Sequence, residues 1–242
     1  MYGKVVPINL ATSTAGKPID AGSPGNIAFP PGGATAYMVT PADNGTVTPV
    51  DTATNTPGKP IPVGPSPRDV VITPDGKTLY VTTGNGVVPV STATGTAGTP
   101  IRFGLHSAAA LAITPDGKTL YVTSGSGQKA RLTAVSTADN RPGPAIKVPG
   151  TTVQMLITPD GKTLYLFSDG RSASITPVST ATNQPGKQIR VASGVIMAMT
   201  PDGKTLYALG QGKVVPISTA TNQPGKPIRF PSADPQGMVV AP

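Results

Sequence analysis

A nine-residue motif returns through the chain at nearly constant spacing, and this repetition restricts the fold more than any other feature. The motif at residues 72–80 reads Ile-Thr-Pro-Asp-Gly-Lys-Thr-Leu-Tyr. Further copies stand at residues 113–121, 157–165 and 199–207, and a degenerate copy stands at residues 29–37. The final tyrosines of successive copies are 41 to 44 residues apart. A period of this length is typical of proteins built from repeated units that each pack against their neighbours.

A second motif follows the first and supplies the rest of each unit. It reads Val-Val-Pro-Val-Ser-Thr-Ala-Thr at residues 87–94, and related segments bring the number of copies to six: residues 5–12, 47–54, 132–139, 175–182 and 214–221. Each unit predicts four short strands, as at residues 69–72, 77–82, 87–91 and 100–103. Four antiparallel strands every ~40 to 45 residues are typical of one blade of a β-propeller.

Glycine and proline, 29 of each, stand at fixed places in this pattern. Pro-Asp-Gly at residues 74–76 predicts a tight hairpin between the first two strands. Pro-Gly at residues 57–58, 185–186 and 224–225 predicts a type II turn between the third and fourth strands. Proline also recurs inside the third strand, at Pro7, Pro49, Pro89, Pro177 and Pro216. Because proline has no N–H, we expect a β-bulge there, or a position that lacks a ladder partner.

We therefore predict an all-β fold, a six-bladed β-propeller of four-stranded antiparallel blades that forms one domain over residues 1–242. The chain starts in a third strand (residues 5–9) and ends in a first strand (residues 237–242). The two ends are expected to share one blade and close the ring, which removes free sheet edges. The closing blade has no copy of the second-strand motif. Either it has three strands or its second strand lies outside this sequence, and seven blades in the parent protein is the alternative count.

Residues 73–82 and 114–123 read Thr-Pro-Asp-Gly-Lys-Thr-Leu-Tyr-Val-Thr, and in this they resemble the YVTN-type propeller repeats of bacteria and archaea. The resemblance extends over essentially the whole chain. It implies a propeller fold and an extracytoplasmic location, in a surface-layer-like protein or a sensor module joined to other domains. Such repeats are also similar to the propellers of lactonases and quinoprotein dehydrogenases.

Residue types that commonly carry catalysis are scarce. The chain has no cysteine and no glutamate, its eleven acidic residues are all aspartates, and His106 is the only histidine. Four aspartates occupy one equivalent turn position, which would disperse them around a ring: Asp75, Asp116, Asp160 and Asp202. A hard cation needs several oxygen ligands at one point. We therefore expect no metal, no cofactor and no catalytic residue, and predict that the chain is not an enzyme.

The net charge of +8 does not predict a nucleic-acid partner. Its lysines repeat at equivalent turns and would spread around the perimeter, whereas nucleic-acid binding favours a one-sided basic patch with aromatic platforms. No run of about 18 apolar residues is present, so we expect no membrane insertion. We also expect a monomer.

Residues that break the repeat are the best candidates for recognition, because the repeat itself does not require them. Loops on a rigid scaffold are where recognition residues usually lie. We predict a contact surface that contains Arg68, Asp69, His106, Gln154 and Arg171. The predicted function is a non-catalytic binding or scaffold module, as the sensor domain of a larger protein, for a protein, peptide or glycan partner.

Two alternative functions stay open. A metal-dependent lactonase-like hydrolase would need carboxylates that converge on the axis of the ring. A purely structural repeat protein, recently amplified or engineered, is favoured by the near-identity of residues 180–190 and 219–229.

Overall fold

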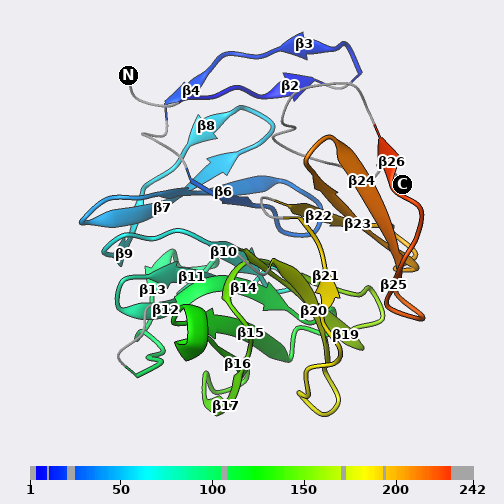
Figure 1. Ribbon diagram of the computed structural model, residues 1–242. Helices are drawn as coiled ribbons and strands as arrows, with labels where there is room; N and C mark the ends of the chain where they lie inside the picture. The colour runs from blue at the N-terminus through cyan, green and yellow to red at the C-terminus, as the bar shows by residue number, and fades with distance from the viewer. Residues whose placement is uncertain are drawn as a thin grey trace. The chain divides into compact units, whose positions relative to one another are not determined.

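The computed structural model describes residues 4–9, 11–20, 25–104, 108–169, 173–192 and 195–229. The chain divides into two compact units, Met1–Leu111 and Ala112–Pro242. The described residues form five antiparallel sheets of four or five strands and two sheets of two strands, shown in Figure 1. Their one helical segment is a short 3-10 helix, Gly127–Lys129. The predicted all-β class is therefore confirmed.

Unit 1 begins with two short strand pairs. These are β1 (Lys4–Val5) with β4 (Ile19–Asp20), and β2 (Ile8–Asn9) with β3 (Thr14–Ala15). The next sheet has the order β5 (Ile27–Ala28), β6 (Thr35–Thr40), β7 (Gly45–Asp51) and β8 (Thr56–Pro57), with β9 (Ile61–Gly64) also on β7. The third has the order β10 (Val70–Ile72), β11 (Thr78–Thr83), β12 (Gly86–Ser91) and β13 (Thr96–Ala97).

Unit 2 repeats this arrangement. One sheet contains β14 (Ala108–Ile113), which starts in unit 1, then β15 (Thr119–Ser124), β16 (Arg131–Ser136) and β17 (Pro142–Lys147). Another contains β18 (Thr151–Ile157), β19 (Thr163–Asp169), β20 (Ser174–Ser179) and β21 (Ile189–Arg190). The last contains β22 (Ile196–Met199), β23 (Thr205–Gly210), β24 (Lys213–Ser218) and β25 (Gln223–Pro224), with β26 (Ile228–Arg229) also on β24.

In the five larger sheets the first four strands pair in chain order, which is the antiparallel meander predicted for a propeller blade. The second strand of each meander is largely buried. In β11, Leu79, Tyr80 and Val81 have at most 1% of their surface exposed. A strand buried on both faces carries a continuous apolar run. The motif Leu-Tyr-Val therefore forms the centre of a sheet that is covered on both sides.

Successive sheets pack face to face within each unit. In unit 1, Val39 and Val47 share a core cluster with Leu79 of the following sheet. In unit 2, Phe167 and Ile175 share one with residues of β22 and β23. Within each unit, apolar residues of one repeat are therefore buried against the next repeat, as in repeat proteins.

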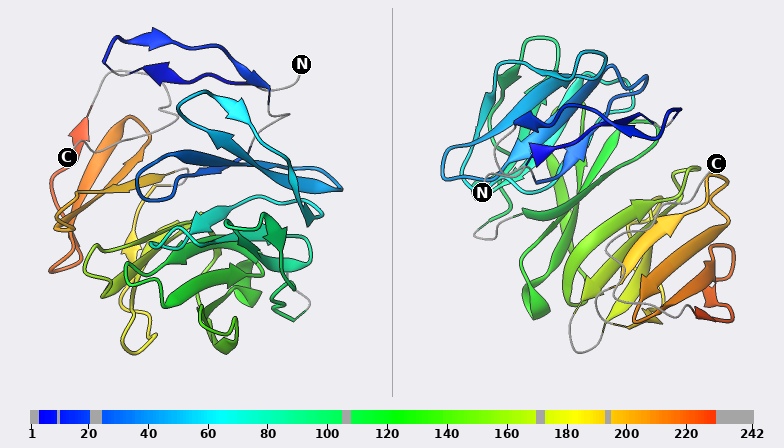
Figure 2. Two further views of the ribbon diagram at one scale, coloured as in Figure 1. Left: turned by 180° about the vertical axis from the view of Figure 1, so that it is seen from behind. Right: turned by 90° about the horizontal axis from the view of Figure 1, so that it is seen from above.

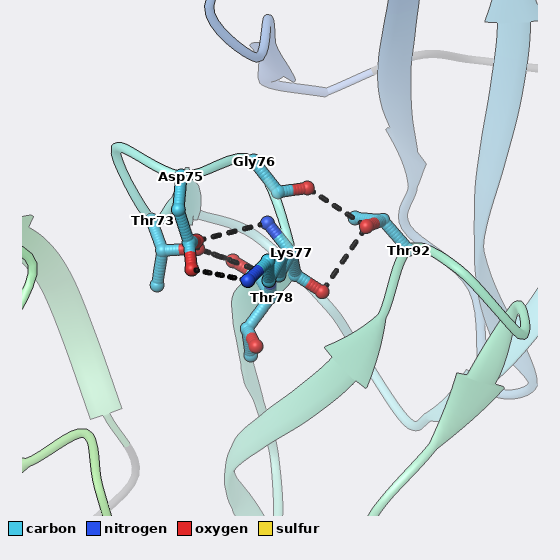
Figure 3. A network of polar contacts seen from close by, with 6 residues as sticks. All are labelled: Thr73, Asp75, Gly76, Lys77, Thr78 and Thr92. Carbon is cyan, nitrogen blue, oxygen red and sulfur yellow. Dashed lines mark hydrogen bonds and ion pairs between the residues drawn. The ribbon is translucent and has the colours of Figure 1, made fainter.

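The turn between the first and second strands is fixed by a small polar network, drawn in Figure 3. The Thr73 hydroxyl donates to Asp75 Oδ1 at 2.6 Å, and the same oxygen accepts the Lys77 N–H at 3.0 Å. Gly76 takes φ +71°, which favours glycine, and Thr92 Oγ1 donates to its carbonyl at 2.7 Å. The hydrogen bonds from Thr73 and Lys77 lower the pKa of Asp75. Equivalent bonds hold Asp116, Asp160 and Asp202. The predicted role of these aspartates as turn residues is confirmed.

The proline of the third strand divides the fourth strand in two. Val50 pairs with Pro57 and Val47 with Ile61, so the fourth strand has one extra residue opposite Pro49. The Pro49 carbonyl accepts the Gly58 N–H at 2.7 Å. The same bond joins Gly16 to Pro7, Gly98 to Pro89, Gly186 to Pro177 and Gly225 to Pro216. The predicted bulge is confirmed. Where Ala134 replaces proline, the fourth strand β17 is one six-residue strand, but an extra residue lies opposite Ala134 as well, since Thr133 pairs with Ala145 and Val135 with Pro142.

The prediction of Pro-Gly as the turn between the third and fourth strands is wrong. The chain reverses earlier, at residues 52–55, and Asn55 ends the turn at φ +56°. Asn140, Asn183 and Asn222 adopt the same conformation at φ +56° to +57°. Asparagine tolerates this left-handed region better than most residues. Pro-Gly therefore lies in the fourth strand, against the proline of the third.

The repeat tyrosines join one sheet to the next in unit 2. Tyr165 has no exposed surface, and its hydroxyl donates to Asn222 Oδ1 at 2.7 Å. The Tyr121 hydroxyl donates to Asn183 Oδ1 at 2.8 Å. Each tyrosine thus fills the core with its ring and fixes the left-handed asparagine of the following sheet.

Alkaline pH is expected to destabilise the protein through these tyrosines. Burial raises the pKa of Tyr165 from its usual 10.0 to about 12, and the negative charge of Asp160 adds to the shift. The folded state therefore favours the neutral phenol, whose contribution to stability is complete below the unfolded pKa and is lost as the pH rises toward the folded pKa. Urea denaturation from about pH 9 to about pH 12 should show the free energy of unfolding falling, and falling less in Tyr165→Phe. Identical profiles for the two proteins would contradict this assignment.

Candidate functional site

A half-buried carboxylate, Asp69, stands where the chain enters β10. Its Oδ1 accepts hydrogen bonds from Asn26 Nδ2 at 2.9 Å and from the Val70 N–H at 3.0 Å. Its Oδ2 accepts the Leu111 N–H at 2.8 Å. Asn26 precedes β5 and Leu111 lies in β14, so Asp69 connects the first strands of three successive sheets.

The environment of Asp69 differs from that of the turn aspartates. Burial raises the pKa of Asp69, although the hydrogen bonds from Leu111, Asn26 and Val70 oppose the shift. By contrast, hydrogen bonding lowers the pKa of Asp75 in its exposed turn. A carboxylate that is partly removed from water and has a raised pKa is a candidate for a catalytic base.

Gln154 makes a related bridge in unit 2. Its Nε2 donates to the Met197 carbonyl at 3.0 Å, and its Oε1 accepts the Met197 N–H at 2.7 Å. Residues 26, 69 and 111, like residues 154 and 197, are one repeat apart. A polar side chain on a first strand therefore pairs with the backbone or side chain at the equivalent position of the next sheet. Asn26 was not among the predicted site residues, although its place in the repeat, 43 residues before Asp69, could have indicated it.

The five predicted contact residues have different outcomes. Arg68 is exposed and precedes Asp69, and its N–H donates to the Thr82 carbonyl at 3.1 Å. Gln154 belongs to unit 2 and Arg68 and Asp69 to unit 1. His106 and Arg171 lie outside the described residues. The structure thus brings together two of the five, and a contact surface formed by all five stays a prediction.

A polar hollow of about 480 Å³ lies in unit 2 among the turns that begin β15 and β19. Its lining includes Asp116, Asp160 and Tyr121. The Oδ1 atom of each aspartate is already bonded to a threonine hydroxyl and a lysine N–H of its own turn. The repeated turns therefore account for the hollow, and its carboxylates accept hydrogen bonds from residues of their own turns.

Across the described ranges, no group of three or more histidine, cysteine or acidic side chains could hold a metal ion. In the same ranges, no helix is long and apolar enough to cross a membrane.

No protein-family model and no curated protein sequence matches the chain. Solved structures do resemble it. Hydrazine synthase of Kuenenia stuttgartiensis matches with a TM-score of 0.76 and 24% sequence identity, over 86% of this chain and 66% of that one. The chain thus spans slightly less than two thirds of that protein. The periplasmic gluconolactonase of Pseudomonas aeruginosa matches with a TM-score of 0.72 and 15% identity, over 97% of this chain and 80% of that one. These likenesses support a propeller-like fold.

The comparisons correct the predicted function. The sequence favoured a non-catalytic binding or scaffold module, whereas both similar structures carry the names of enzymes. The name of the gluconolactonase corresponds to the lactonase-like alternative, and at 15% identity the likeness shows the fold alone. The sequence favoured the binding module because it showed no converging carboxylates, and the burial of a single aspartate is visible only in three dimensions. A likeness in fold does not test catalysis, so the absence of enzymatic activity stays a prediction.

Proposed function

We propose that this chain is a lactonase-like hydrolase in which Asp69 is the proton acceptor. One observation carries the proposal: Asp69 is half-buried where the chain enters the first strand of its sheet, β10, and burial raises its pKa. It is supported by a fold similar to that of a gluconolactonase. The proposed substrate class is a sugar lactone. No step requires a metal ion, in contrast to the metal-dependent form of the alternative.

The proposed reaction is hydrolysis of the cyclic ester. Asp69 Oδ2 has one described donor, Leu111 N–H, so a lone pair remains to bind water. The water oxygen forms a bond to the lactone carbonyl carbon while Asp69 takes its proton, and the ring C–O bond then breaks. The proton passes to the leaving alkoxide, which gives the open hydroxy acid. Arg68 is exposed beside Asp69 and is proposed to stabilise the negative charge that develops on the carbonyl oxygen.

We also propose that the sheets are the blades of a six-bladed YVTN-type propeller, closed by the two ends of the chain as one domain over residues 1–242. The proposal rests on six copies of the third-strand motif and on the four-stranded meanders. The expected closing segment, residues 237–242, lies outside the described residues.

Asp69→Asn is expected to reduce lactone hydrolysis by about 10²- to 10⁴-fold, because this is the usual contribution of general base catalysis. The assay follows acid release from gluconolactone by the purified chain, above the spontaneous rate, with and without a chelator. In the wild type, the rate should rise with pH through the raised pKa of Asp69.

Asp75→Asn is the matched control, because it removes an equal charge from an exposed turn in the same unit. It should retain the wild-type rate. If the wild type does not exceed the spontaneous rate, the proposed hydrolysis of sugar lactones is wrong. If Asp69→Asn hydrolyses the lactone like the wild type, Asp69 is not the base.

A further inference from the structure

The same five residues occur twice in the chain with different surroundings. Lys-Val-Val-Pro-Ile stands at residues 4–8, across β1 and β2, and again at residues 213–217 in β24. In β24, one edge pairs with β23, with Ile217 opposite Leu206 and Pro216 opposite Tyr207. Among the described residues, β1 pairs with β4 and β2 with β3, and no strand lies on their other edge. Figures 1 and 2 show β2 and β3 as a separate hairpin.

The two copies of this segment also differ in the burial of their isoleucine. Ile217 has no exposed surface, whereas its counterpart Ile8 is 56% exposed. The corresponding residues of the other four third strands, Val50, Val90, Val135 and Val178, are at most 2% exposed. This position is therefore a core position of the repeat, and it is uncovered in the first copy alone among the described residues.

The rest of this half-blade is already in place. Ile19 of β4 is buried, and it packs with Val5 against Met38 of the following sheet. The Pro7 carbonyl accepts the Gly16 N–H at 2.8 Å, as Pro216 does from Gly225 at 2.7 Å. In an antiparallel strand, successive backbone groups point to opposite sides. Since Pro7 faces β3, the N–H and C=O of Ile8 point to the open edge.

We propose that the open edge of β1 and β2 binds an extended segment of a different protein, by addition of a strand in the position of a second strand. The register follows from β23 and β24: a leucine of the partner lies opposite Ile8 and a tyrosine opposite Pro7. The partner therefore has the pattern Lys-Thr-Leu-Tyr followed by small or aliphatic residues. Main-chain hydrogen bonds supply affinity in this mode of recognition, and alternate side chains supply specificity.

The test uses the full chain and a fluorescent synthetic peptide with the sequence of residues 201–211, which contains β23. Fluorescence anisotropy should show saturable binding of one peptide per chain. A peptide with serine in place of Leu206 and Tyr207 should bind at least tenfold more weakly. In the chain, Ile8→Asp should weaken binding by at least tenfold.

Phe29→Asp is the matched control, because Phe29 is as exposed as Ile8, at 56%. It should bind the peptide like the wild type. Binding that survives Ile8→Asp would overturn the proposal, because the peptide would then occupy another sheet. No binding, together with marked destabilisation by Ile8→Asp, would show that the chain covers this edge itself. A dimer that Ile8→Asp dissociates would show that a second copy covers it, which also overturns the proposal.

Discussion

Replacement of Tyr165 by alanine is expected to lower the free energy of unfolding by about 3–5 kcal/mol, the usual cost of truncating a large buried aromatic side chain. Tyr165 has no exposed surface and belongs to the cluster that joins β19 and β20 to β22 and β23. Alanine would leave a cavity between two sheets and would remove the donor to Asn222. Urea denaturation at neutral pH measures the loss.

Tyr165→Phe separates the two contributions. It keeps the ring and removes the hydroxyl, so the loss should be about 1 kcal/mol, the net value of a typical hydrogen bond. If both variants lose the same free energy, the bond to Asn222 carries the effect and the packing does not. A loss below about 1 kcal/mol in Tyr165→Ala would show that the two sheets can close over the cavity.

The four-stranded sheets could be predicted from the sequence because most of their strands are specified locally. Leu79 and Tyr80 have counterparts in the second strands β15, β19 and β23, and Asp75 and Gly76 fix the turn before β11 through bonds within six residues. Local patterns of this kind are recognisable without knowledge of distant contacts. The fourth strand was predicted less well, because Pro49 and Gly58 determine its break through a contact between strands.

The candidate base could be named from the sequence, but its role could not. Asp69 was selected because it breaks the repeat, whereas its pKa is raised by burial, against the effect of hydrogen bonds from donors 43 and 42 residues away. The pairing of Gln154 with Met197 shows that the same position is also used to connect sheets. Whether a repeat-breaking residue serves catalysis or assembly depends on its three-dimensional surroundings, which composition and spacing do not contain.

Gly86→Ala is expected to destabilise unit 1 nearly as much as the loss of Tyr165 destabilises unit 2. Gly86 begins β12 at φ +125°, a conformation that costs a residue with a side chain about 1–3 kcal/mol. A Cβ there would lie 2.2 Å from the carbonyl oxygen of Ile101. That oxygen accepts the Val87 N–H at 3.0 Å, and Val87 accepts the Ile101 N–H at 2.7 Å. Relief of the clash therefore breaks a backbone bridge and adds a further cost of about 1–3 kcal/mol.

Gly64→Ala separates the clash from the conformational strain. Gly64 has φ +102°, and a Cβ there would meet nothing within 4 Å. Its replacement should cost the strain alone, about 1–3 kcal/mol. Urea denaturation should therefore give Gly86→Ala a free energy of unfolding at least about 1 kcal/mol lower than that of Gly64→Ala. Equal losses would mean that the bridge between Val87 and Ile101 contributes nothing to stability. The part of the fourth strand that follows its break, which contains Ile101, would then be free to separate from the sheet.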